Sequence, residues 1–172
     1  LNHKVDALTS TLIEAIQIQS FAVRPVKIAL VSDYSLGGDV IVTHKSIENL
    51  SGLRGRAVGA EVSSLGIFIL QRGLQKQGMS FKDIEVKNVE QMSAVKHMEN
   101  KDISAFVTYP PTSIELLKNP NYHVIFDSAQ IPKEVVDVIS ISNSYLEKYP
   151  ETLEKLWQAW QLSYQFINTN NA

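Results

Sequence analysis

The chain has 172 residues, of which 44% are hydrophobic and 20% charged, and its 16 basic and 18 acidic side chains leave a net charge of -2. This composition excludes an intrinsically disordered or collagen-like chain, and without a basic excess we expect no nucleic-acid partner. Because the chain contains no cysteine, it can form no disulfide, thiolate nucleophile or iron–sulfur site of its own.

Short β-branched runs alternate with longer amphipathic stretches, which is typical of an α/β protein. The hydroxyl residues Thr9–Thr11 predict the cap of a first helix, which ends before Pro25 because proline cannot continue it. Most of the following apolar runs are apolar on both faces, which favours mostly parallel sheets flanked by helices. The predicted strands are Val26–Val31, Val40–Thr43, Ala57–Ala60, Ile84–Val89, Ser104–Thr108, Val124–Phe126 and Val135–Ile141.

Three further helices are predicted. Ser63-Ser64 caps the second helix, and Gln91–Asn100 forms a short third. The last begins at Asn143 or the next residue, and its apolar residues recur at helical spacing as far as Tyr164. We expect this apolar face, with its two tryptophans, to pack against the core or an interface.

Catalytic and metal motifs are absent from the sequence. The four histidines lack the HExxH and HxH spacings of zinc sites, and neither a GxSxG nucleophile motif nor a GxxxxGK phosphate loop occurs. We therefore predict no catalytic residues, no metal and no cofactor.

The segment Ser32–Asp39 directly follows an apolar strand and contains two carboxylates and two glycines. In open α/β sheets, ligands bind beyond the carboxyl ends of the strands. Such a segment either contacts a ligand or forms an Asx-rich turn that satisfies its own backbone. The residues alone leave both interpretations open.

Two other segments offer candidate ligand contacts. Glu61–Ser64 leads into a serine-capped helix, whose free N–H groups attract an anion, although capping alone explains the serines equally well. Thr9–Thr11 supports the same hypothesis more weakly. Tyr109 ends an apolar strand and either presents a flat amphipathic surface to a ligand or simply caps the strand.

Several motifs in chain order resemble the periplasmic substrate-binding proteins of ABC importers, in the group that handles aliphatic sulfonates, taurine, nitrate and thiamine precursors. The most specific match is to the pattern D-Y-S-x-G-x-D-x-I-V. The sequence departs from the family where His3 replaces a usual glycine and where Pro110 occupies a position that is often acidic. The matching segments are Lys4–Ala7, Asp33–Ser35 with Gly38–Val42, Leu53–Gly59, Ser128–Pro132 with Val136–Val138, and Tyr149–Glu151.

This resemblance implies a two-lobed, type II binding-protein fold. Residues 1–38 and 133–172 would form lobe one and residues 39–132 lobe two, with the ligand held between them. It also implies that the chain lacks the N-terminal part of lobe one. The implied ligand-binding positions are Ser10, Thr11, Asp33, Ser35, Gly38, Asp39, Glu61, Ser63, Ser64 and Tyr109.

The function implied by the resemblance is capture of a small polar, anionic or zwitterionic solute outside the cytoplasm for an ABC permease, without catalysis. The protein would be periplasmic, either free or tethered by a segment outside this chain. One alternative is an extracytoplasmic sensor domain of a histidine kinase or diguanylate cyclase. Another is an enzyme resembling thiamine-pyrimidine synthase, which the lack of cysteine disfavours.

Overall fold

The computed structural model describes residues 5–21 and 25–170. The chain divides into two compact units, of which the first comprises Leu1–Asp33 and Val136–Ala172 and the second Tyr34–Val135. The chain therefore passes into the second unit once and returns once. The assignment of these units to the two lobes of the family stays a prediction.

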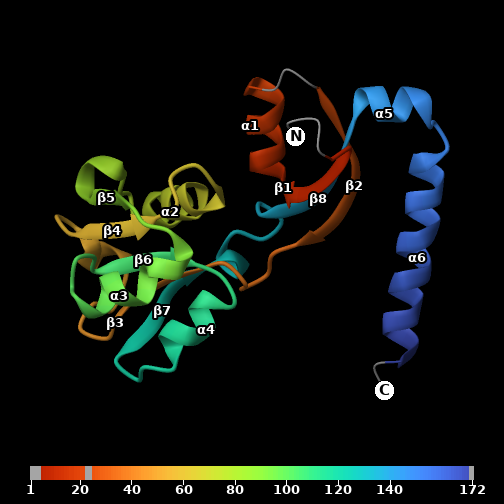
Figure 1. Ribbon diagram of the computed structural model, residues 1–172. Helices are drawn as coiled ribbons and strands as arrows, with labels where there is room; N and C mark the ends of the chain where they lie inside the picture. The colour runs from red at the N-terminus through yellow and green to blue at the C-terminus, as the bar shows by residue number, and fades with distance from the viewer. Residues whose placement is uncertain (1–4, 22–24, 171–172) are drawn as a thin grey trace. The chain divides into compact units, whose positions relative to one another are not determined.

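In the first unit, the described residues form a three-stranded sheet in the order β1-β8-β2 and the helices α1, α5 and α6 (Figure 1). Strands β1 and β8 are antiparallel, with Thr9 opposite Ile139. The elements are β1 (Ala7–Thr11), α1 (Leu12–Phe21), β2 (Val26–Tyr34), β8 (Val136–Ser142), α5 (Asn143–Lys148) and α6 (Thr152–Asn170).

The first unit corrects two sequence predictions. Thr9–Thr11 form the end of β1 rather than a purely capping segment, although Thr11 does cap α1. The predicted last helix is two helices, because Pro150 lacks the N–H and the backbone freedom needed to continue α5 into α6. The apolar face of α6 is not buried against the described residues, where Trp157 is 48% exposed, so its packing at an interface stays a prediction.

The second unit contains a five-stranded sheet in the order β5-β4-β6-β3-β7. It is mixed rather than mostly parallel: β4 runs parallel to β5 and β6, whereas β3 runs antiparallel to its neighbours β6 and β7. Its elements are β3 (Val40–His44), β4 (Ala57–Ala60), α2 (Leu65–Lys76), β5 (Glu85–Asn88), α3 (Ala94–Glu99), β6 (Ala105–Thr108), α4 (Thr112–Leu117) and β7 (Tyr122–Asp127), with short 3-10 turns between them.

Helices contact the strands on both faces of this sheet, so that β3 is buried on both sides. Val40 and Val42 belong to a buried cluster with Met98 of α3 and Leu116 of α4. Ile41, between them, points the opposite way, toward Gly73 of α2. A Cβ at Gly73 would lie 3.2 Å from the Ile41 side chain, so glycine lets α2 approach the sheet closely.

All seven predicted strands form, with ends that differ by a few residues. The α/β class is therefore confirmed, and the elements missed by the sequence analysis are β1 and the short helix α4. Within residues 5–21 and 25–170, no helix combines the length and apolar character required to cross a bilayer.

Candidate functional site

The residues that the sequence singled out in the second unit gather at one edge of its sheet. Val40, the first residue of β3, lies opposite Thr108 at the end of β6 and Asp127 at the end of β7. Strand β4 runs parallel to β6, so its carboxyl end reaches the same edge. Asp39, Glu61 and Tyr109 each adjoin one of these strand ends. We call this end of the sheet, where β4, β6 and β7 finish, the carboxyl edge. Sheets of α/β proteins bind their ligands beyond the carboxyl ends of their strands.

Ser128 lies in the segment through which the chain leaves the second unit, and its side chain hydrogen-bonds to the segment through which the chain enters. Its buried Oγ accepts the backbone N–H of Gly37 at 2.7 Å and of Asp39 at 3.4 Å. It also lies 2.9 Å from Ser35 Oγ. Because the Ser128 oxygen accepts two N–H groups, its own hydrogen is available to Ser35, which in turn hydrogen-bonds the Asp39 side chain. The Ser35 N–H donates to the Val135 carbonyl at 3.0 Å.

Asp39 is the buried carboxyl group of this network, with 9% of its surface exposed. Burial raises its pKa because the charged form loses hydration, and the hydrogen bond from Ser35 acts in the opposite direction. A carboxyl group held in this way accepts hydrogen bonds when ionised and can donate one when protonated.

Glu61 belongs to a second network on the same edge. Its Oε1 accepts the Gln91 backbone N–H at 3.1 Å, and the Gln91 side-chain Oε1 accepts the Thr108 hydroxyl at 2.7 Å. The Val62 N–H donates to Asn88 Oδ1 at 3.2 Å. Gln91 and Asn88 were not predicted as site residues, because they reach this edge only through the pairing of β4, β5 and β6.

The amino terminus of α2 lies at this edge, because the chain passes directly from the end of β4 into the helix. Ser64 caps the helix by accepting the Gly66 N–H at 3.5 Å, and its hydroxyl donates to the Glu61 carbonyl at 3.3 Å. Ser63 is exposed, and its hydroxyl has no partner among the residues that the structure describes. The structure thus assigns capping to Ser64 and leaves Ser63 available to a ligand.

Tyr109 and Gly38 complete the predicted contacts in the second unit. Tyr109 follows the end of β6, with 44% of its surface exposed. Gly38 does not adopt the left-handed backbone; Gly37 does, with φ of 88°. The need for glycine in this turn therefore lies at Gly37, and a Cβ at Gly38 would lie 3.2 Å from Ser35 Oγ.

The remaining predicted contacts, Ser10, Thr11 and Asp33, belong to the first unit. Thr11 forms a capping box with Glu14: its N–H donates to Glu14 Oε2 at 3.0 Å, and the Glu14 N–H donates to Thr11 Oγ1 at 3.4 Å. The Ser10 hydroxyl donates to the Thr11 carbonyl at 3.2 Å. Asp33 lies exposed within β2, which runs three residues beyond its predicted end. Their role toward a ligand stays a prediction.

The described residues contain no group of three or more acidic or histidine side chains arranged to hold a metal ion. In the second unit, the carboxyl edge instead combines two hydrogen-bonded carboxyl groups, one free hydroxyl, one half-exposed tyrosine and a helix amino terminus. Such a set can orient a small polar molecule through hydrogen bonds and attract a negatively charged group.

Comparisons with solved structures give high similarity at low sequence identity. The periplasmic aliphatic sulphonate-binding protein SsuA from Escherichia coli matches with a TM-score of 0.83 and 16% identity, over 98% of this chain and 58% of that chain. The alkanesulfonate-binding protein SsuA from Xanthomonas axonopodis pv. citri, bound to MOPS, matches with a TM-score of 0.78 and 11% identity, over 96% of this chain and 57% of that chain.

The desulfurization enzyme DSZB also shares this fold, with a TM-score of 0.71 and 13% identity, over 93% of this chain and 62% of that chain. The chain thus spans less than two thirds of each of these three structures. A comparison with curated protein sequences gives no match. The NMT1/THI5-like family model matches residues 3–171, and this protein belongs to that family.

Proposed function

We propose that this chain binds a small polar solute with an anionic or zwitterionic head and delivers it, outside the cytoplasm, to an ABC permease. The observation that carries the proposal is the convergence of Asp39, Glu61, Ser63 and Tyr109 on the carboxyl edge of one sheet, beside the amino terminus of α2. The family and the fold, which it shares with periplasmic sulfonate-binding proteins, support the same role.

Each group at this edge has a distinct task in holding the solute. The first N–H groups of α2 and the free hydroxyl of Ser63 receive the anionic head. The half-exposed ring of Tyr109 packs against the apolar part of the solute. Glu61 retains a carboxylate oxygen that its bond to the Gln91 N–H does not use, and this oxygen accepts from an ammonium group.

DSZB shows that this fold also occurs in an enzyme. Transport and catalysis differ in what happens to the solute, which a binding protein leaves unchanged. We propose binding without chemical change, since the described groups of the carboxyl edge hold and orient a solute through hydrogen bonds and a helix amino terminus. After incubation with the protein, the solute should be recovered unchanged by mass spectrometry. Recovery of a converted product would contradict the proposal.

Calorimetric titration of the full-length protein with 1-butanesulfonate and with taurine tests the site. At least one should bind, whereas 1-butanol should not, because it lacks the anionic head. Replacing Ser63 with leucine should weaken binding about tenfold or more, since a hydrogen bond to a charged group is worth about 1.5–3 kcal/mol.

The matched control is Ser51→Leu, which makes the same substitution at an exposed serine remote from this edge. It should leave the affinity unchanged. Binding of neither anion to the unmodified protein, or equal affinities for the two variants, would overturn the proposed site.

A further inference from the structure

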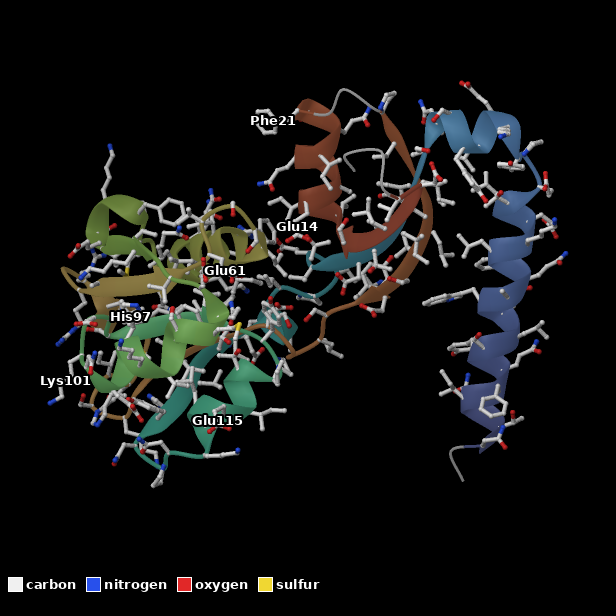
Figure 2. The ribbon with its side chains drawn as sticks, viewed as in Figure 1. Glu14, Phe21, Glu61, His97, Lys101 and Glu115 are labelled. Atoms are coloured by element: carbon white, nitrogen blue, oxygen red, sulfur yellow. The ribbon has the colours of Figure 1, made fainter. Side chains whose placement is uncertain are left out.

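The second unit contains a cavity at the edge of its sheet opposite the candidate solute site. Its volume is about 610 Å³, within the range of roughly 300–1,000 Å³ that is usual for small-molecule pockets. It is lined by residues at the end of β3, at the start of β7, and in the turns before β4 and β6. Figure 2 shows Lys101, which lines this cavity, and Glu61, which marks the carboxyl edge, at opposite ends of the unit.

Part of the cavity wall is apolar. Ile47, Met98 and Ile103 line it and are buried, with 7%, 4% and 3% of their surfaces exposed. Tyr122 adds an aromatic ring, which meets the His44 ring edge-on with 6.2 Å between ring centroids. These groups provide a surface for the apolar body of a ligand.

Two cations at the cavity lack an acidic partner among the described residues. Arg56 Nε donates to the Gly52 carbonyl at 2.8 Å, and the other guanidinium nitrogens make no hydrogen bond with residues 5–21 or 25–170. Lys101 likewise forms no ion pair within those residues. By contrast, Arg54, two residues before Arg56, is paired with Asp83. The charges of Arg56 and Lys101 are therefore available to a ligand.

His44 supplies an N–H donor. Its Nδ1 accepts the Ser46 backbone N–H at 3.2 Å, which places the proton of the neutral ring on Nε2. Ser46 Oγ lies 2.9 Å from the same Nδ1. The Nε2–H of the ring thus adds a donor at the cavity wall.

The formal charge of the lining favours a single negative charge on the ligand. Arg56 and Lys101 carry one positive charge each, and Glu99 carries one negative charge, which leaves a net charge of one positive. Burial, and then the charge of Glu99, raises the pKa of Tyr122, so its hydroxyl remains a donor at neutral pH. A monoanion neutralises this net charge, whereas a dianion would leave a net negative charge.

The backbone at Lys101 adds an independent observation. Lys101 follows the end of α3 with φ of 61°, a left-handed conformation in which glycine or asparagine is favoured. Lysine is unfavourable in this backbone conformation, yet here it places a cation at the cavity.

We propose that this cavity is a second ligand site, in which Arg56 and Lys101 bind the charged group of a small organic monoanion and the wall formed by Ile47, Met98 and Ile103 contacts its apolar body. It is separate from the solute site proposed above, so either site can fail its test without affecting the other.

Benzoate is a suitable probe because it combines one carboxylate with one apolar ring. In an NMR titration of the full chain, benzoate should shift the amide signals of Ser46, Met98 and Tyr122. Acetate lacks the ring and benzyl alcohol lacks the charge, so each should bind at least about fivefold more weakly. Shifts confined to other residues, or equal binding of benzyl alcohol, would overturn the proposal.

Lys101→Gly separates binding from folding, because glycine suits the left-handed backbone while removing the cation. It should weaken benzoate binding about fivefold or more without lowering the stability of the chain. Lys133→Gly is the matched control, since Lys133 also has a positive φ, of 64°, but does not line the cavity. Arg56→Gln should weaken binding and Arg54→Gln should not. Equal affinities within either pair of variants would refute the site.

Discussion

The hydroxyl of Ser128 should contribute more to the stability of the second unit than any exposed serine, and Ser128→Ala tests this. The side chain is fully buried. It accepts the N–H groups of Gly37 and Asp39, and its hydrogen is available to Ser35. The substitution removes one oxygen atom and, with it, the side-chain hydrogen bonds between segments that are about ninety residues apart in the chain, whereas the Ser128 N–H still donates to the Asp39 carbonyl at 2.9 Å.

The expected loss follows from the burial of those partners. A typical hydrogen bond contributes about 1 kcal/mol net, and a buried donor left without an acceptor costs about 1–3 kcal/mol. The Asp39 N–H is buried and loses its acceptor, whereas Gly37 is exposed and can bond to water. We therefore expect Ser128→Ala to lower the free energy of unfolding by about 2–3 kcal/mol.

Urea unfolding followed by circular dichroism measures this loss as a lower midpoint with an unchanged slope. Ser51→Ala is the control, because the exposed Ser51 hydroxyl makes one bond, of 3.3 Å, to Gln77, which water can replace. Its cost should stay below about 0.5 kcal/mol. Equal losses for the two variants would refute the role assigned to Ser128.

Two further predictions concern the core and the pH dependence of stability. Gly59→Ala should destabilise the chain by about 1–3 kcal/mol in the same assay, because a Cβ there would lie 2.7 Å from Ile103 and 2.8 Å from Phe106; a loss below about 0.5 kcal/mol would show that these side chains yield. For Asp39, the raised pKa means that the folded state binds more protons than the unfolded state while the pH lies between 3.8 and that raised pKa. The stability of the unmodified protein should therefore fall, relative to Asp39→Asn, as the pH rises from 3.8 through that raised pKa. Parallel pH profiles would contradict this sign.

The strands of the second unit were predictable because burial on both faces leaves uninterrupted apolar runs in the sequence. Val40–Val42 and Ala57–Ala60 are of this kind, and both form strands. The pattern fails for β1, whose residues Thr9–Thr11 are polar and where no residue is fully buried. The apolar pattern also does not predict strand direction, because a strand buried on both faces has the same sequence pattern in parallel and antiparallel sheets.

The candidate site was only partly predictable, because its sequence-local and long-range parts leave different signals. Asp39 and Glu61 stand beside strand ends, where a polar residue is conspicuous in the sequence. Gln91 and Ser128 join the same edge through partners at least sixteen residues away. The sequence around each of these two residues does not predict such a partner. Their positions depend on strand register, which turns and core packing determine.

The two edges of the second sheet differ in how their polar groups are satisfied. At the carboxyl edge, Ser128 and Gln91 hold neighbouring side chains in hydrogen-bonded networks, so a ligand meets groups that are already oriented. At the opposite edge, Arg56 and Lys101 have no acidic partner among residues 5–21 and 25–170, and their charges lie on long side chains with several rotatable bonds. Fixed groups favour selectivity for ligand shape, whereas unpaired charges favour selectivity for ligand charge. The solute site should therefore discriminate among anions of equal charge, and the second cavity should accept several monoanions that share an apolar body.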